Sequence, residues 1–237
     1  MNSRSRPARS TGATTRDQLI EAGIRLLEED GPEALQTRRV AAAVGVSTMA
    51  VYTHFGGMTG LLEAIATEAF ARFGAALARV APTADPVADL FVMGTAYHRY
   101  ALANPQRYRL MFGLTAPHVF GMPAPQAGRG IVRDLTAGPA DDAIGAETFE
   151  QLVRVTERII EGGHIRTDPV RRVAARLWGM IHGVVLLELS GHLGGENRAL
   201  VDVLAPLTVD VLVGMGADRG DVEASLGRAI RTITSAR

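Results

Sequence analysis

The sequence predicts an all-α protein in which a small N-terminal domain containing a helix-turn-helix precedes a larger helical domain. Apolar residues recur at helical spacing through most of the 237 residues, and no segment shows the strict alternation of apolar and polar residues that is typical of a strand. Two short helical segments joined by Gly45-Val46-Ser47 have the spacing of a helix-turn-helix. About nine helices are expected in all.

The first part of the chain contains four predicted helices, most of which begin at a hydroxyl side chain and end at a glycine. A hydroxyl before a helix accepts hydrogen bonds from its first N–H groups, and a glycine after it adopts conformations that end the helix. The predicted helices run from Thr14 or Thr15 to Gly31-Pro32, over 38–44 with Thr37 as the cap, over 48–55 with Ser47 as the cap, and over 59–80.

The second part begins after a linker at residues 81–84 and is also helical. Pro105 suits the first turn of a helix, where its missing N–H group has no helical partner to lose. Residues 113–145 are rich in Gly and Pro and are expected to be mobile or disordered. The predicted helices cover 86–104, 105–112, 146–162, 169–192 and 198–215, and an amphipathic stretch over 222–233 is a candidate for a terminal helix.

The composition excludes several classes of protein. The chain has no Cys, which excludes a disulfide framework, a thiolate zinc site and a Cys nucleophile. It has no Lys, which excludes Schiff-base chemistry on lysine and a P-loop lysine. Neither a signal peptide nor an uninterrupted apolar span is found, so a cytoplasmic protein without membrane contact is expected.

Positive charge is concentrated beside the predicted helix-turn-helix, although the 25 basic and 25 acidic residues of the chain balance. No acidic residue occurs between Ala34 and Leu62, whereas Arg38 and Arg39 stand at the start of the second helix. The segment 1–16 adds four Arg and no acidic residue. Phosphate contacts require such local positive charge, and the N-termini of the second and third helices add N–H groups that suit phosphates.

The predicted third helix has an inward and an outward face. Val51 and Phe55 are one turn apart and are expected to pack inward. Tyr52, Thr53 and His54 carry groups that suit phosphate and sugar contacts. With no Asn, Gln or Arg on the outward face, base reading would depend on hydroxyl groups and on apolar contact with thymine methyls. The outward set, expected to meet a major groove, is Thr48, Met49, Ala50 and Thr53.

The run from Thr37 to Phe55, TRRVAAAVGVSTMAVYTHF, together with Leu61-Leu62, resembles the N-terminal domain of the tetracycline-repressor (TetR/AcrR) family. The resemblance covers residues 14–65. It implies a DNA-binding transcriptional regulator, most simply a repressor, that binds a palindromic operator as a homodimer and is released by a small effector. The chain then divides into a flexible basic arm at 1–13, a helix-turn-helix DNA-binding domain at 14–58, a connecting helix at 59–80 and a C-terminal ligand-binding and dimerisation domain at 81–237.

By position, the resemblance implies that Thr37 and Arg38 contact the DNA backbone or a base edge. The family usually has a Lys three residues after the Phe, and this chain has Met58 there. The change removes one phosphate contact per subunit, which weakens DNA binding and its salt dependence. Arg16 or the N-terminal arm is the candidate replacement. The full predicted DNA-contacting set is Arg16, Thr37, Arg38, Ser47, Thr48, Met49, Tyr52, Thr53 and His54, with Thr48 and Met49 near bases and Tyr52 and His54 on phosphates.

A second resemblance lies in the C-terminal half. The segment 177–191, LWGMIHGVVLLELSG, resembles the Trp-x-x-x-His-Gly (WHG) helix of one TetR C-terminal subfamily, as does 104–112, NPQRYRLMF. It implies that the helices over 169–192 and 198–215 form a four-helix dimer interface across a two-fold axis. The alternative, that the two helices pack within their own subunit, stays open. The predicted interface residues are Gly183, Leu186, Leu189, Leu204, Leu207 and Val211.

Aromatic and Met side chains in the C-terminal half are candidates for the wall of an effector cavity, because apolar ligand cavities are lined by such residues. An ordinary packed core is the alternative, and a histidine on a largely apolar helix is more often a core residue than a ligand contact. The lining predicts an apolar or aromatic effector rather than a charged one. The candidate set is Phe91, Tyr97, Tyr100, Tyr108, Met111, Phe112, Phe149, Trp178 and His182.

An enzyme is the first competing interpretation, but the six His show no metal-binding spacing and no Gly-x-Ser-x-Gly elbow occurs. No catalytic residue, metal or cofactor is therefore expected. A regulator that activates, that ignores ligands or that acts through a partner protein remains open, as does a helical small-molecule-binding protein that does not bind DNA. The expected partners are a double-stranded DNA operator, a small effector and a second copy of the chain.

Overall fold

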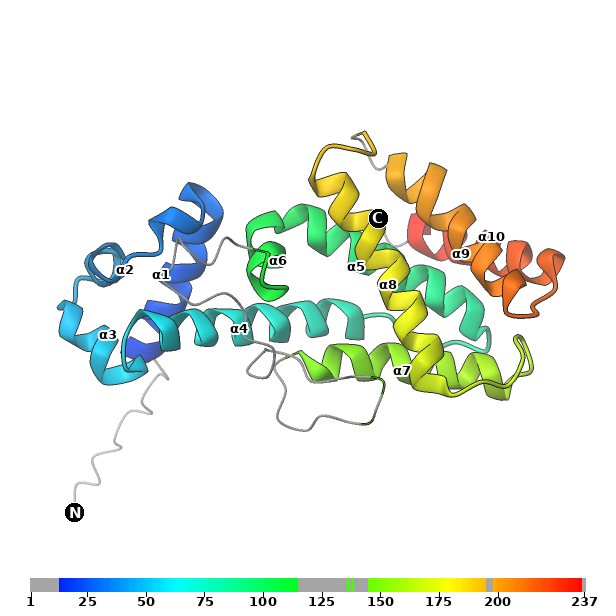
Figure 1. The fold of residues 1–237 in the computed structure, drawn as a ribbon, viewed down its shortest axis with the longest axis horizontal. Helices are drawn as coiled ribbons and strands as arrows, with labels where there is room; N and C mark the ends of the chain where they lie inside the picture. The colour runs from blue at the N-terminus through cyan, green and yellow to red at the C-terminus, as the bar shows by residue number, and fades with distance from the viewer. Residues whose placement is uncertain (1–12, 115–135, 137, 139–144, 195–197, 236–237) are drawn as a thin grey trace, which may run out of the picture.

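The computed structural model describes residues 13–114, 136, 138, 145–194 and 198–235, and every regular element in them is a helix. The all-α prediction is confirmed. Figure 1 shows a small group of N-terminal helices at one end of the molecule and a larger group at the other, with one long helix running between them. The predicted arm at 1–13, except Ala13, and nearly all of the segment at 113–145 lie outside the described residues.

The N-terminal group consists of four α-helices and a short 3-10 turn at Pro32–Ala34. Thr14, one of the two predicted candidates, caps the first helix, and its side chain and that of Asp17 form reciprocal capping hydrogen bonds. The predicted cap Thr37 is instead the first residue of the second helix. That prediction is wrong by one residue, because the carbonyl of Gln36 accepts the first helical hydrogen bond. The helices are α1 (Thr15–Asp30), α2 (Thr37–Val44), α3 (Thr48–Phe55) and α4 (Met58–Ala78).

Two glycines allow these helices to pack closely. Gly45 follows α2 with φ at 75°, in the left-handed region that favours glycine, and turns the chain into α3. Gly60 lies in α4, where a Cβ atom would collide with the backbone carbonyl oxygen of Phe55 at the end of α3. The helices enclose a core whose fully buried members include Leu19, Val40, Val51, Leu61 and Ile65.

The larger group contains six more α-helices and a π-helical stretch at Ala199–Leu204. The predicted helix over 198–215 is therefore divided, because the π-helical stretch leads into a helix whose first turn contains Pro206. The described residues hold ten α-helices where about nine are predicted, and the predicted ends of the others differ by a few residues. The helices are α5 (Pro86–Ala103), α6 (Pro105–Met111), α7 (Ala146–Glu161), α8 (Val170–Leu189), α9 (Ala205–Gly214) and α10 (Arg219–Ser235).

Helix α6 contacts both groups. Leu110 packs in the N-terminal core, whereas Tyr108 and Met111 on the same short helix are buried in the core of the larger group. The Nε of Arg107 donates to Oε1 of Glu28 on α1 at 2.7 Å, and the backbone N–H of Arg107 donates to the same oxygen at 3.2 Å. A displacement of α6 would therefore act directly on the first helix of the N-terminal group.

Candidate nucleic-acid interface and ligand cavity

Helix α3 presents an exposed face of the kind that its sequence predicts. Val51 is fully buried and Phe55 is half-buried against the N-terminal core. Met49 and Tyr52 are 67% and 56% exposed, which is unusual for side chains of their size and apolar character. Exposed large apolar groups on one helix face mark a surface that meets a partner.

The charge on this surface depends on which arginines are already paired. Arg39 forms an ion pair with Asp30 at 2.6 Å, so its charge is partly neutralised within the chain. Arg38 is exposed and has no carboxylate partner among the described residues. The guanidinium of Arg16 lies 5.3 Å from the centre of the Phe55 ring, which holds the start of α1 beside the end of α3.

The hydroxyl groups of the predicted site differ in how they are used. Ser47 is exposed and precedes α3, and its side chain makes no capping hydrogen bond, so the hydroxyl is free of the helix. Thr53 is exposed but donates to the carbonyl oxygen of Met49 at 3.0 Å. Thr48 and His54 are also exposed. Because successive residues of a helix point about 100° apart, Tyr52, Thr53 and His54 do not share one direction.

Met58 has a structural contact in place of a charge. Its side chain is half-buried against the N-terminal core, and Thr37 Oγ1 lies 3.9 Å from its sulfur. Thr37 is itself half-buried, and its hydroxyl lies against the sulfur of Met58 on α4. No cation is therefore present at position 58.

A cavity of about 700 Å³ lies among the helices of the larger group, lined from α4, α5, α7, α8, the π-helical stretch, α9 and α10. Five of the nine candidate effector residues are on its wall, and four are not. The wall residues are Phe91, Tyr97, Phe112, Phe149 and Trp178. The other four are Tyr100, Tyr108, Met111 and His182.

A polar network behind the wall explains the position of two of these four. The Tyr108 hydroxyl lies 2.7 Å from the Tyr97 hydroxyl and 2.7 Å from Nδ1 of His182. Burial raises the pKa of both tyrosines and lowers the pKa of His182, so all three side chains are uncharged near neutral pH. The network joins α5, α6 and α8, and Tyr97 connects it to the cavity.

A buried polar pair that was not predicted from the sequence lies between α5 and α8. Nε2 of His98 lies 2.6 Å from Oε2 of Glu188, and both side chains are buried. Nδ1 of His98 has no hydrogen-bond partner in the part of the chain that the structure describes. A separation of 90 residues along the chain leaves no local signal for this pair.

The predicted interface residues differ in how exposed they are. Leu204 is only 3% exposed and lines the cavity, so its assignment to an intersubunit surface is corrected. Leu207, three residues later, is 37% exposed and is not among the residues that line the cavity. Exposed Leu187 on α8 was not predicted, although it belongs to the same apolar run. The half-buried members of the predicted set are Gly183, Leu186, Leu189 and Val211.

Helix α10 and the π-helical stretch supply cavity residues that the sequence analysis does not name. Leu226, Ile230 and Ile233 line the cavity from α10, and Leu200 and Val201 line it from the π-helical stretch. Their amphipathic spacing predicts a packed helix face, but it gives no sign that the face borders a cavity.

None of the helices in the described part of the chain combines the length and apolar character that a membrane span requires.

Two family models match the chain. The model described as "Bacterial regulatory proteins, tetR family" matches residues 19–65. This range includes the exposed surface of α2 and α3 that carries Arg38, Ser47, Thr48, Met49 and Tyr52, here called the α2–α3 face. The model described as "Tetracyclin repressor-like, C-terminal domain" matches residues 90–212, just over half of the chain. No comparison tests the WHG assignment, which stays a prediction.

Individual relatives agree with these matches. The chain is 26% identical over 218 residues to the HTH-type transcriptional regulator Rv1816 of Mycobacterium tuberculosis, covering 79% of this chain and 91% of that protein. It is 37% identical over 57 residues to the class D tetracycline repressor protein of Escherichia coli, covering 24% of this chain and 26% of that protein. The solved structure of RolR with its ligand resorcinol matches with a TM-score of 0.61 and 17% identity, covering 90% of this chain and 93% of that chain, which shows a shared fold.

Proposed function

The chain belongs to the tetR family of bacterial transcriptional regulators, and from that premise we propose that it is a repressor with a palindromic DNA operator. It binds the operator as a dimer and is released by a small effector with a mainly apolar or aromatic body. The observation that carries the proposal is the α2–α3 face, which contains no acidic residue and exposes Met49, Tyr52 and Arg38, the last without a carboxylate partner among the described residues.

Each group on this face has a role that suits DNA. Arg38 contacts a phosphate or a base edge, and the free Ser47 hydroxyl and the N-terminal N–H groups of α3 contact the backbone. Met49 makes apolar contact with a thymine methyl, and Tyr52 donates to a phosphate. Thr48 faces the bases, whereas Thr53 contributes less than its sequence position suggests, because its hydroxyl already donates within the helix.

The dimer forms through α8 and α9. Leu187 and Leu207 are large exposed side chains on these two helices, and Gly183 permits close approach of a second helix. A two-fold axis that buries this surface pairs each patch with its own copy, as closed dimers require. The proposed division of the chain places DNA binding at 14–58, the connecting helix at 59–80, and effector binding and dimerisation at 81–237.

The effector acts through elements that border both the cavity and the N-terminal core. Phe73 and Leu77 of α4 line the cavity, whereas Ile65 of the same helix lies in the N-terminal core. Phe112 lines the cavity directly after α6, and Leu110 of α6 lies in the N-terminal core. A ligand that moves these helices changes the separation of the two α3 helices of the dimer, which must be about 34–36 Å to read successive major grooves.

Selection of duplexes from a random DNA pool by the purified full chain, at one fixed salt concentration, tests the proposal. Wild-type protein is expected to select a palindrome, and Arg38→Gln and Tyr52→Ala are expected to lose it. Arg231→Gln, which removes an exposed charge on α10, is the matched control and should select the same palindrome. Failure of the folded, dimeric wild-type protein to select any duplex would overturn the proposed DNA-binding function.

A second candidate function is a regulator that binds DNA but does not respond to ligands. It would be favoured if the affinity for the operator stays constant whichever ligand is bound. An increase in transcription on binding would favour an activator. These two outcomes concern only the sign and the control of regulation, because the α2–α3 face supports DNA binding in each case.

A further inference from the structure

The wall of the cavity offers few free hydrogen-bonding groups. The Thr95 hydroxyl donates to the carbonyl of Phe91 at 3.0 Å, and the Thr208 hydroxyl donates to the carbonyl of Leu204 at 2.7 Å. Both donors are thus used within their own helices. Because most of the remaining wall is aliphatic or aromatic, burying a polar ligand there would leave its polar groups unpaired. The body of a matching ligand is therefore apolar.

Four charged side chains line the cavity within the described residues, and three of them are a single arginine paired with two carboxylates. Arg219 lies 2.7 Å from Asp210 and 3.7 Å from Glu223. The fourth is Arg99 of α5, for which the described part of the chain provides no carboxylate partner. A guanidinium in this position is available for a charge-assisted hydrogen bond with an anion from outside the chain.

The exposed members of the wall mark where the cavity opens to solvent. Val201 and Ile230 line the cavity and are 66% and 52% exposed, whereas Phe73 and Leu177 are buried within it. Arg99 is also exposed. Besides the paired Arg219, Asp210 and Glu223, the exposed part of the wall offers apolar side chains and one cation, Arg99, that has no carboxylate partner among the described residues. This combination suits a ligand whose apolar part enters the cavity while its anionic group stays at the surface.

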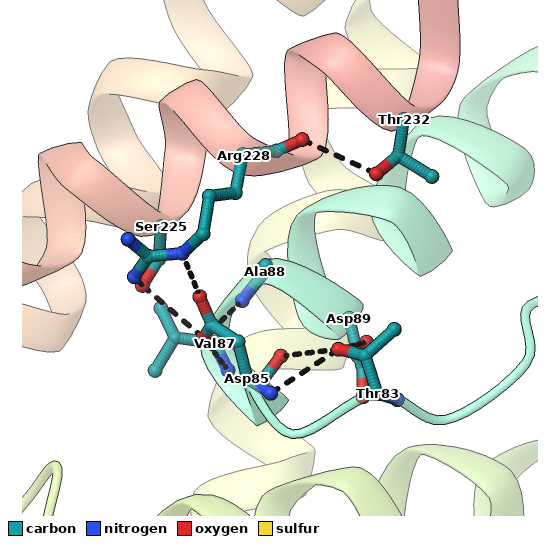
Figure 2. Close-up of polar contacts among 8 residues, drawn as sticks. All are labelled: Thr83, Asp85, Val87, Ala88, Asp89, Ser225, Arg228 and Thr232. Atoms are coloured by element: carbon teal, nitrogen blue, oxygen red, sulfur yellow. Dashed lines mark hydrogen bonds and ion pairs between the residues drawn. The ribbon is translucent and has the colours of Figure 1, made fainter. Parts of the chain in front are cut away.

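Helix α10 forms part of this opening and is held in place through Asp85, as Figure 2 shows. Asp85 caps α5 by accepting hydrogen bonds from the N–H groups of Val87 and Ala88. Its carboxylate also accepts from Nε of Arg228 at 2.6 Å and from the hydroxyl of Ser225 at 3.2 Å, both on α10. Because α10 lies outside the ranges 19–65 and 90–212, this wall belongs to neither matched family model.

We propose that the cavity binds a monoanionic and otherwise apolar ligand of the chemical class of a medium-chain carboxylate, whose anionic group pairs with Arg99. At about 30 Å³ for a water-sized group, a cavity of about 700 Å³ holds on the order of twenty non-hydrogen atoms. Resorcinol, the ligand of the RolR structure, is much smaller than this. The inference rests on the effector site of the proposed function, and it adds an anionic group to the apolar effector that the sequence predicts.

Trp178 provides a direct measurement of binding, because it is the only Trp in the chain and lines the cavity. We would titrate the full chain with dodecanoate and with dodecan-1-ol, which have the same apolar body, and follow Trp178 fluorescence. Dodecanoate is expected to bind about tenfold more tightly, a ratio that fits one charge-assisted contact at a partly exposed site. Arg99→Gln is expected to remove the difference, and Arg231→Gln to retain it. Circular dichroism of both variants checks that they fold.

The outcomes separate this inference from the proposed function. Equal affinities for the two probes, a preference that survives in Arg99→Gln, or no response of folded wild-type protein to dodecanoate would each overturn the ligand class. Operator affinity is measured in a separate titration. If dodecanoate binds through Arg99 without changing operator affinity, the ligand class stands and the effector role fails. If resorcinol releases DNA while dodecanoate does not bind, the effector role stands and the ligand class fails.

Discussion

Nε of Arg107 lies 2.7 Å from Oε1 of Glu28, and this ion pair joins α6 of the larger helical group to α1 of the N-terminal group. Both side chains are mostly buried, and a second bond links Arg107 to the side chain of Asn104. The pair therefore connects the part of the chain that surrounds the cavity to the part that carries the α2–α3 face.

A double-mutant cycle on this pair measures its strength. Glu28→Gln and Arg107→Gln are each expected to lower the free energy of unfolding, and their coupling is expected to be about 1 kcal/mol, because the pair is partly shielded from water. Urea unfolding of the wild type, the two single variants and the double variant checks this. Strictly additive effects would show that the pair does not hold the two groups together.

Restoring a cation at position 58 is expected to strengthen DNA binding. Met58→Lys removes the sulfur contact with Thr37 but adds a positive charge beside the α2–α3 face. The plot of log affinity against log salt should steepen by roughly one per added phosphate contact, or about two for a dimer. Anisotropy titrations of the selected duplex at several salt concentrations measure this. Met58→Gln is the neutral control, and the same slope in both variants would contradict the prediction.

Gly60→Ala is expected to destabilise the N-terminal group by about 2 to 3 kcal/mol, because the added Cβ collides with a backbone oxygen that cannot rotate away. The displacement of α3 should also weaken DNA binding. Gly227→Ala in the interior of α10 is the control, since only a flexible arginine tip is nearby, and it should stabilise the protein by about 0.5 to 1 kcal/mol. Thermal unfolding measures both changes, and equal effects of the two substitutions would be inconsistent with this geometry.

Stability is expected to depend on pH through His182. Burial lowers the pKa of His182 below its ordinary value of 6.5. Above pH 6.5 His182 is mainly neutral in both states, and the free energy of unfolding is retained in full. Between this value and the lower pKa of the folded state, the unfolded chain takes up a proton on His182 that the folded chain does not. The free energy of unfolding therefore decreases as the pH falls through this range. Urea unfolding between pH about 7.5 and about 5.5 should show a smaller loss for His182→Gln than for wild type. His54→Gln, at an exposed site, is the control and should keep the pH dependence of stability that the wild type shows. If His182→Gln loses as much stability as the wild type between these pH values, His182 is not the cause of the loss.

The sequence predicts most helices within a few residues because their signals are local. Thr14 and Gly45 act on the hydrogen bonds and dihedral angles of their own turn, so their neighbours along the chain suffice to interpret them. The exposed face of α3 follows for the same reason, since the period of a helix separates Val51 from Met49 without reference to the rest of the fold. The error of one residue at Thr37 arises where no side chain caps the helix.

The tertiary structure alone decides what each apolar side chain contacts. Leu204 and Leu207 are three residues apart in similar sequence, yet the first lines the cavity and the second is exposed. Likewise Phe112 lines the cavity while Tyr108 joins a buried network with His182, and His98 meets Glu188 across 90 residues. The sequence by itself determined where most helices begin and end, to within a few residues, and which face of α3 is exposed. The cavity, the place of Arg99 on its wall and its α10 wall depend on how distant helices pack, because burial is set by neighbours that local periodicity does not identify.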